Sequence, residues 1–256
     1  MNPGRLLEIA VAAARASGDH ALMHQSRRRE TLSRSPRDIK LVLDRECQTV
    51  AESVICEAIP DACILGEEGN RGAKQDTEWI VDPIDGTANF FRHLPWWCSS
   101  VAVRSGDTMV AGAVYAPEFG RLYAASVDGP ATLNGQPIQV SPVTSMAETF
   151  ITTGISKTSV DASRSMAVTL QLQPEVMKLR IMGAAALDLC MVAEGVVDGF
   201  YETGIYIWDV AAACLIVERA GGRTITQNHQ PDGRLTCIAG TGLTFPRLRE
   251  LASQTH

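Results

Sequence analysis

No two of the seven cysteines are spaced as CxxC, and none of the five histidines falls within a motif. The missing cysteine spacing argues against a zinc site. The cysteine count is odd and several cysteines lie in apolar surroundings, which favours reduced, buried thiols. We therefore expect a cytoplasmic chain that neither zinc nor disulfides hold together.

Positive charge is also scarce, because 23 Lys and Arg are set against 29 Asp and Glu, a net charge of -6. A general nucleic-acid binder usually carries a basic face, so we expect no direct nucleic-acid partner. An anionic substrate stays possible, since a bound metal ion inverts the local field.

Long hydrophobic runs are absent, so we expect no membrane partner. Glu8 and Arg15 interrupt the apolar N-terminal stretch, whose apolar residues recur at helical spacing. This pattern indicates an amphipathic helix rather than a signal peptide.

The first part of the chain combines helical spacing with strand-like alternation. We expect helices over 4–26 and 42–58, a solvated basic connection between them, short strands in CILGEEG and EWIVDP, and an antiparallel meander from about 101 to 133.

The second part alternates strands and helices, as in α/β proteins. TFITTGI predicts a buried strand, GAAALDLCMVAEG a helix that ends at Gly195, and WDVAAACLIVERAGG a helix that ends at Gly221 and Gly222. We therefore predict an α+β part over 1–145 and an α/β part over 146–256.

The segment WIVDPIDGTANF, residues 79–90, places two acids after an apolar run. Pro83 fixes its φ angle and favours a turn that brings Asp82, Asp85 and the Ile84 carbonyl to one point. Three hard oxygens select Mg²⁺, Mn²⁺ or Ca²⁺ rather than zinc. The alternative is an acidic turn that caps a helix without any metal.

Further polar groups in this region suit phosphate chemistry. Gly86 and Thr87 follow the acids, and N–H groups at a helix start hold phosphate, while a threonine hydroxyl orients water. Glu67 and Glu68 also read as a solvated loop, and Asp209 as a helix N-cap. Carboxylates at several strand ends and helix starts are nevertheless what a two-metal phosphate site requires.

Together these segments resemble the inositol monophosphatase family from the first helix to about Ala239. The likeness rests on WIVDPIDGTANF and WDVAAACLIVERAGG, on GEE at 66–68, and on RIMGAAALDLCMVAEGVVDG and LNGQPIQVS. It implies a layered αβαβα sandwich of the inositol monophosphatase and fructose-1,6-bisphosphatase type, usually assembled as a homodimer.

The resemblance also implies a metal site that takes two or three Mg²⁺ ions, or Mn²⁺ in their place. Glu67, Asp82 and the Ile84 carbonyl would hold the first ion, and Asp82, Asp85 and Asp209 the second. A third, weaker ion would contact Glu67. Lithium would replace one of the ions and inhibit.

For the attacking water, the resemblance implies that Thr87 orients it and that Asp44 hydrogen-bonds the threonine. The chain departs from the family here, because DIKLVLD carries Leu41 in place of the usual threonine, with Lys40 before it. That departure alters the support of Asp44.

Substrate contacts are implied for a wider set of residues. They are Asp85, Gly86, Thr87, Gly183, Ala185, Glu202 and Asp209. Glu202 would accept hydrogen bonds from ring hydroxyls, although a lone glutamate is more often a solvated acid.

We therefore expect a Mg²⁺-dependent phosphatase that hydrolyses a small phosphate monoester, with inositol monophosphate the favoured substrate. A metal-activated water would attack phosphorus directly, without a phosphoenzyme. Histidinol phosphate, fructose 1,6-bisphosphate, NADP and 3′-phosphoadenosine phosphates are alternatives within the family. A regulatory binding protein on the same scaffold is an alternative of another class, since some bacterial relatives associate with the transcription machinery.

Overall fold

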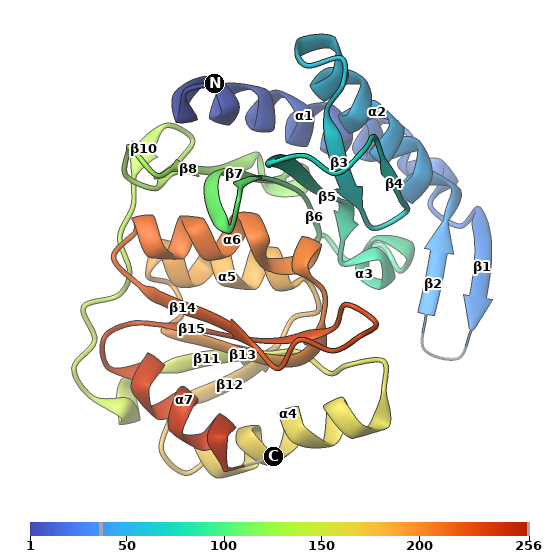
Figure 1. Ribbon diagram of the computed structural model, residues 1–256. Coiled ribbons are helices and arrows are strands. Elements are labelled where there is room, and N and C mark those ends of the chain that lie inside the picture. The colour runs from blue at the N-terminus through green and yellow to red at the C-terminus, as the bar shows by residue number, and fades with distance from the viewer. Residues whose placement is uncertain (36–37, 255–256) are drawn as a thin grey trace.

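The computed structural model describes residues 1–35 and 38–254, which form alternating layers of helices and sheets (Figure 1). The first layer consists of α1, Pro3–Met23, and α2, Val42–Ala58, close to their predicted bounds. The Asn2 side chain accepts a hydrogen bond from the Arg5 N–H and so caps α1.

An eight-stranded sheet forms the second layer. Its strands are β3 (Cys63–Gly66), β4 (Gly69–Arg71), β5 (Thr77–Asp85), β6 (Cys98–Ser105), β7 (Thr108–Ala116), β8 (Arg121–Ser126), β9 (Thr132–Leu133) and β10 (Gln136–Pro137). The order is β10-β9-β8-β7-β6-β5-β3-β4, and all neighbours are antiparallel except β3 and β5. The antiparallel meander expected between 101 and 133 is present. At Gly18 of α1 a Cβ would lie 2.8 Å from the Tyr115 ring, so this glycine lets the helix lie close to the sheet.

The middle layer consists of α5, Ala185–Glu194, and α6, Ile207–Arg219, which lie between the two sheets (Figure 1). Both helices are rich in alanine and buried along most of their length. Gly195, in the left-handed conformation, ends α5 as predicted. Small side chains let these helices approach the strands closely, and a Cβ at Gly112 of β7 would lie 2.9 Å from the Ala212 Cα.

The second sheet contains β11 (Phe150–Thr153), β12 (Lys178–Ile181), β13 (Gly199–Ile205), β14 (Arg223–Gln227) and β15 (Leu235–Gly240). Its order is β12-β11-β13-β15-β14. The strand β11 pairs parallel with β12 and β13, whereas β15 pairs antiparallel with β13 and β14. The sheet is therefore mixed rather than purely of the α/β kind.

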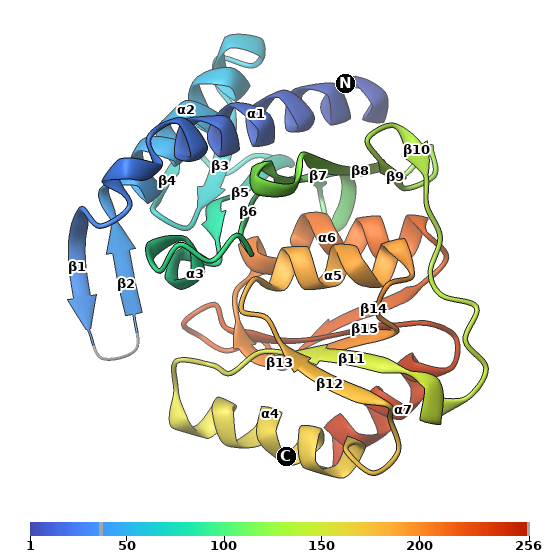
Figure 2. The same ribbon diagram turned by 180° about the vertical axis from the view of Figure 1, so that it is seen from behind.

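The outer layer consists of α4, Ser159–Leu172, and α7, Thr244–Ser253, which cover the far face of the second sheet (Figure 2). The sequence of layers is thus helix, sheet, helix, sheet, helix. This confirms the expected αβαβα fold class.

The basic connection after α1 is not simply a solvated loop. A 3₁₀ turn over Gln25–Arg27 leads into the hairpin strands β1, Thr31–Ser35, and β2, Asp38–Leu41. Arg28 is buried, with its guanidinium over the Phe90 ring. Most of the described residues over 26–35 are nevertheless exposed, as expected from the sequence, and Arg28 is the exception because an aromatic ring receives its guanidinium.

The sequence predicted that the strand carrying the acids ends in a turn at Pro83, and this prediction was wrong. The strand β5 continues to Asp85, and its pairing with β6 is irregular between Asp82 and Asp85. A bulge rather than a turn therefore accommodates the proline.

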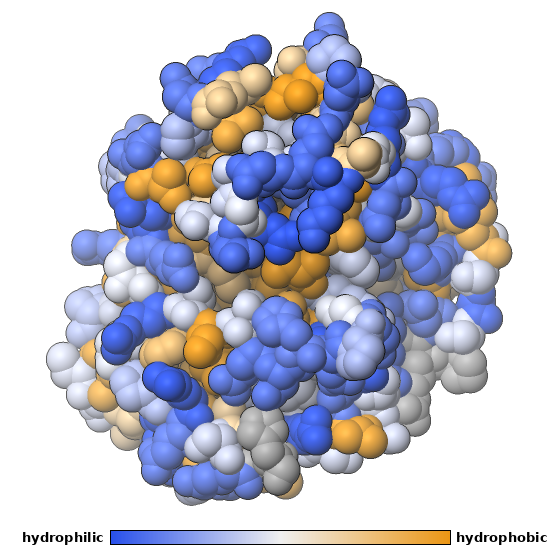
Figure 3. Space-filling view, viewed as in Figure 1, coloured by the Kyte–Doolittle hydropathy of each residue, from blue (hydrophilic) through white to orange (hydrophobic). Residues whose placement is uncertain are grey.

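The face of the molecule in Figure 3 is mostly hydrophilic, with small hydrophobic patches between the polar residues. Over residues 1–35 and 38–254, no helix has the length and apolar character needed to cross a membrane.

Candidate active site

The bulge at the end of β5 orients Asp82 and Asp85. The Asp82 Oδ1 atom accepts the Ile84 N–H at 3.1 Å. The Pro83 carbonyl accepts hydroxyl hydrogen bonds from Ser99, at 2.6 Å, and from Ser17, at 3.2 Å. Two buried serines from α1 and β6 therefore hold the irregular backbone that carries both acids.

Asp85 is also fixed by the start of α5. Its Oδ2 accepts the Ala186 N–H at 2.7 Å, and its Oδ1 accepts the Ala185 N–H at 3.2 Å. The first N–H groups of a helix have no acceptor within the helix, so a carboxylate is a suitable partner. This contact connects β5 of the first sheet to the middle helical layer.

Asp209 is the third residue of α6 rather than its N-cap, which corrects the expectation from sequence. Its Oδ2 accepts the N–H of Tyr206, the capping residue, at 2.6 Å. Ligand oxygens of Asp82, Asp85 and Asp209 all lie within 4.8 Å of one another. The structure thus brings Asp209 together with two acids that precede it by more than a hundred residues in the sequence.

Glu67 and Glu68 do not form a solvated loop. The Glu67 N–H donates to the Val81 carbonyl at 3.1 Å, so Glu67 extends the parallel pairing of β3 and β5. The Glu68 side chain is only 4% exposed and pairs with Lys40 Nζ at 2.8 Å. Lys40 therefore neutralises the second acid of the pair.

The acids are buried together, which raises their pKa values. Burial raises the pKa of Asp82 well above its ordinary value, and Glu67 and Asp85 raise it further. Burial is also the main cause that raises the pKa of Asp85, Asp209 and Glu67 to about 7. Like charges in a desolvated site resist ionisation unless a cation accompanies them.

This donor set fits a hard divalent cation. Asp82, Asp85 and Asp209 offer carboxylate oxygens, and Glu67 and the Ile84 carbonyl line the same cavity. Oxygen-only sites suit Mg²⁺ or Mn²⁺ rather than zinc.

Thr87 and Asp44 do not interact as the resemblance implied. The Thr87 hydroxyl donates to the Ile84 carbonyl at 2.9 Å. Asp44 Oδ2 accepts the Leu41 N–H at 2.7 Å, while its buried Oδ1 has no partner within the described part of the chain. Burial raises the pKa of Asp44 to about 8.

A cavity of about 540 Å³ opens above the acids. All the predicted site residues except Asp44 line it, namely Glu67, Asp82, Ile84, Asp85, Gly86, Thr87, Gly183, Ala185, Glu202 and Asp209. Gly86, with φ of 89°, precedes α3, Thr87–Phe91. A Cβ at Gly86 would lie 2.9 Å from the Trp96 carbonyl, so only glycine fits this approach.

Glu202 is not a solvated acid. It lies buried on β13, and burial raises its pKa well above the ordinary value, with Asp209 contributing next. A Cβ at Gly154 would overlap the Glu202 carboxylate, so this glycine makes room for it. Gly183 adopts a φ of 86° on the cavity wall.

Lys157 and Asp188 are among the cavity residues that were not predicted. Lys157 pairs with Asp38 of β2 at 2.5 Å, and the Asp188 Oδ1 atom accepts the Trp96 indole N–H at 2.9 Å. Asp188 falls within the segment RIMGAAALDLC, which resembles a family segment, so that resemblance was the available signal. Lys157 lies in a loop whose sequence gave no signal.

A layered fold with clustered acids at the floor of a cavity defines a phosphatase of the kind that works with metal ions. A model of the inositol monophosphatase family matches residues 3–256. This chain belongs to the inositol monophosphatase family, whose members are phosphatases.

Individual relatives agree with this assignment. The chain is 36% identical over 227 residues to the Nus factor SuhB of Pasteurella multocida, covering 87% of this chain and 84% of that protein. It is 33% identical over 243 residues to the fructose-1,6-bisphosphatase/inositol-1-monophosphatase of Aquifex aeolicus, covering 93% and 92%. The crystal structure of the extragenic suppressor protein suhB from Bartonella henselae superposes with a TM-score of 0.89 at 28% identity, over 97% of this chain and 98% of that one.

Proposed function

We propose that this phosphatase uses Mg²⁺ to hydrolyse small phosphate monoesters, with inositol monophosphate as the favoured substrate. The observation that carries the proposal is the group of Asp82, Asp85 and Asp209 within one cavity that also contains Glu202. Acids at one end suit a metal and phosphate, and a buried carboxyl group nearby suits an alcohol rich in hydroxyls.

In this proposal, Glu67, Asp82, Asp85, Asp209 and the Ile84 carbonyl would hold the ions. Bound Mg²⁺ supplies positive charge that neutralises the phosphoryl group. The backbone at Gly86 and the following N–H group face phosphate oxygens, because the first N–H groups of a helix lack internal acceptors.

Proton handling falls to Thr87 and Asp44 in this proposal. The Thr87 hydroxyl donates to Ile84 O, and its lone pairs can accept a hydrogen bond from the attacking water. Asp44 Oδ1 has no partner within the described residues and would accept the Thr87 hydroxyl if that hydroxyl turned away from the Ile84 carbonyl. Water would then attack phosphorus directly, the phosphorus–oxygen bond to the alcohol would break, and the proton lost by the water would end on the leaving oxygen, which departs as the alcohol.

The name of the Aquifex relative supports a second substrate, fructose 1,6-bisphosphate. Both substrates are polyhydroxylated alcohols esterified with phosphate, and both suit the same pocket chemistry. Lithium sensitivity and a homodimer also remain part of the proposal, supported by family membership.

The first prediction tests metal dependence and the role of Asp82. Phosphate release is measured over inositol, sugar, histidinol and nucleotide phosphates. Activity should disappear in excess chelator and return with Mg²⁺, and Asp82→Asn should abolish turnover because Asp82 would contribute to holding both ions.

The matched control is Asp107→Asn, an exposed acid in the turn between β6 and β7, which should retain activity. Unchanged phosphate release in chelator, or full activity in Asp82→Asn, would contradict the metal mechanism. If phosphate is released from nucleotide phosphates alone, a nucleotide phosphate rather than inositol monophosphate is the substrate.

A binding function independent of catalysis is a second candidate. It is favoured by the Nus factor name of the Pasteurella relative. A partner whose binding persists in Asp82→Asn would support this function beside the enzymatic one.

A further inference from the structure

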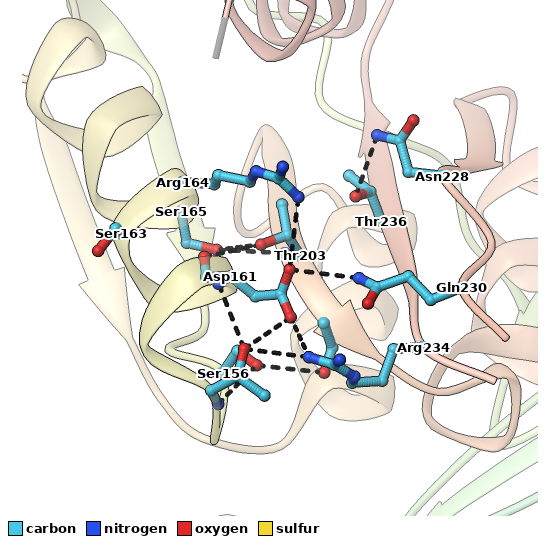
Figure 4. A network of polar contacts seen from close by, with 12 residues as sticks. Ser156, Asp161, Ser163, Arg164, Ser165, Thr203, Asn228, Gln230, Arg234 and Thr236 are labelled. Carbon is cyan, nitrogen blue, oxygen red and sulfur yellow. Dashed lines mark hydrogen bonds and ion pairs between the residues drawn. The ribbon is translucent and has the colours of Figure 1, made fainter. Parts of the chain in front are cut away.

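A partly buried ion pair lies outside the cavity, on the far side of the second sheet. Asp161, in the first turn of α4, has a side chain only 3% exposed and forms an ion pair with Arg234. Its carboxylate also accepts hydrogen bonds from Thr158 Oγ1 at 2.7 Å and from Gln230 Nε2 at 3.3 Å. Arg164 approaches the same carboxylate at 3.7 Å, so Asp161 is the centre of the network in Figure 4.

The ion pair joins α4 to the connection between β14 and β15. Arg234 Nη1 donates to Thr158 Oγ1 at 3.0 Å as well as to Asp161. Thr158 is the N-cap of α4 and directly follows the loop 154–157. The Thr158 N–H donates to Ser156 Oγ at 3.3 Å, which extends the network into that loop.

The same network also forms hydrogen bonds with the end of β13. Thr203 Oγ1 donates to the Asp161 carbonyl at 2.8 Å, and the Thr203 N–H donates to Ser165 Oγ at 3.1 Å. Gly204, with φ of 76°, allows the strand to lie against α4, because a Cβ there would overlap Ser156 and Asp161.

The alternation of side chains along β13 connects these contacts with α4 to the cavity. Successive side chains of a strand point to opposite faces, so Thr203 faces α4 while its neighbour Glu202 faces the cavity. The loop on the other side of the network also reaches the cavity, through Ser156 and Lys157. The end of β13 and the loop 154–157, both of which the network joins to α4, thus contribute to one wall of the cavity.

We propose that the Asp161–Arg234 ion pair is a positioning element that sets this wall and thereby selects a polyhydroxylated leaving alcohol. The inference rests on the proposed phosphatase function and adds a determinant of its substrate class. Of the acids proposed to hold the ions, Asp82 and Asp85 lie on β5, Asp209 on α6 and Glu67 directly after β3, and none of the contacts given above reaches these segments. The ion pair therefore acts on alcohol recognition rather than on metal binding.

A role in stability alone is the competing explanation. Buried ion pairs often contribute little net stability compared with apolar residues of similar volume. A positioning role differs from a stabilising one because it affects one class of substrate more than another. The test therefore compares two esters on variants of similar stability.

The kinetic test uses Arg234→Met in the full-length protein with saturating Mg²⁺. For inositol monophosphate, KM should rise about tenfold with kcat nearly unchanged, because misplacing a recognition group weakens binding. For glycerol 2-phosphate, which makes few contacts with the wall, both parameters should stay as in the unmodified protein. Arg234→Lys keeps the charge but lacks the fork that reaches two acceptors, so it should rescue only part of the loss.

The matched control is Arg247→Met. It removes the ion pairs of Arg247 with Glu175, at 2.6 Å, and Glu250, at 2.7 Å, which lie at α7 on the same outer layer. This control should leave both esters unaffected. If Arg234→Met proves too unstable, Thr158→Val removes one hydroxyl of the network, keeps the ion pair and should shift KM in the same direction by less.

A second readout does not depend on catalysis. Hydrogen exchange of the backbone amides in 154–158 and 203–205 should be faster in Arg234→Met than in Arg247→Met, while exchange in β5 stays equal. Unchanged exchange in these segments, or a parallel loss of activity on both esters, would overturn the positioning role. If the unmodified protein hydrolyses neither ester, the proposed function fails, whereas the exchange measurement still decides the role of the ion pair.

Discussion

Glu202 is a buried acid that lines the cavity proposed to bind the substrate. Its carboxyl group is held against Gly154 at the cavity wall, and its pKa is raised by burial and then by Asp209. Such a group binds substrate hydroxyls in a dry environment, where an unpaired polar partner costs about 1–3 kcal/mol. Glu202 is therefore the residue most suited to discriminate between alcohols.

We predict that Glu202→Gln lowers kcat/KM for inositol monophosphate roughly 5- to 150-fold, the factor equivalent to that energy. Glutamine keeps the shape but exchanges one acceptor oxygen for a donor. Hydrolysis of glycerol 2-phosphate should barely change, because the metal acids remain. Steady-state kinetics on both esters provide the measurement.

Glu57→Gln, at an exposed position on α2, is the control for Glu202→Gln and should affect neither ester. A parallel fall on both esters would mean that Glu202 supports the metal site. No fall on either would remove it from substrate recognition.

At the scale of residues, sequence could identify the acids but not all of their partners. Asp82 and Asp85 stand close together in a motif that is specific in combination with the other family segments. Asp44 accepts the Leu41 N–H within the capping box of α2, and Leu41 replaces the expected threonine, so the sequence indicated altered support of Asp44 but not the absence of a bond to Thr87. Lys157 reaches the cavity from a loop, where spacing carries no information.

At the scale of elements, the bulge of β5 determines the site more than any helix does. The buried Pro83 carbonyl is satisfied by two serines, Ser17 from α1 and Ser99 from β6. Either hydroxyl alone still provides a donor. Loss of both leaves a buried carbonyl without these donors, beside the strand end that carries two metal acids.

We predict that the double substitution Ser17→Ala with Ser99→Ala lowers the free energy of unfolding by about 1–3 kcal/mol, the cost of an unsatisfied buried group. Affinity for Mg²⁺ should fall as well, because the bulge orients Asp82 and Asp85. Denaturant unfolding and calorimetric Mg²⁺ titration measure the two effects.

The control for the serine pair is Ser53→Ala with Ser163→Ala, two exposed helical serines whose hydroxyls also donate to backbone carbonyls. It should change neither quantity appreciably. A double variant at the bulge that is as stable as each single variant would argue that water replaces both serines.

Elements with local signals were predictable and those set by distant pairing were not. Helical spacing located α2 and α5, and alternation located the meander. The hairpin β1–β2 was missed because its residues are mostly polar and β1 is exposed along its length, so no apolar alternation marks that strand. The mixed second sheet was missed because strand direction depends on how β15 returns beside β13.

At the scale of the whole molecule, the acids connect layers that are otherwise separate. Asp82 and Asp85 come from the first sheet, whereas Asp209 comes from the middle helical layer. Bringing these charges together opposes folding, and a bound cation reverses that opposition. The metal site should therefore couple catalysis to global stability.

The last prediction concerns the metal-free protein at different pH values. In the folded state the pKa values of Asp85, Asp209 and Glu67 are raised to about 7. In the unfolded chain the pKa values of such carboxyl groups are about 4. Between these values the folded state holds more protons than the unfolded state, so the free energy of unfolding falls as pH rises. The stabilising effect of protonation is complete at low pH and is lost as pH rises through about 7.

Thermal unfolding in chelator should therefore give a Tm that decreases from about pH 5 to about pH 8, whereas saturating Mg²⁺ should remove most of that decrease. Asp85→Asn removes one of the titrating groups and should flatten the decrease in chelator, while Asp107→Asn, at an exposed turn, should not. Parallel Tm curves with and without Mg²⁺ would show that these acids are not the ones that bind the ion. A decrease that persists unchanged in Asp85→Asn would assign the pH dependence to other groups.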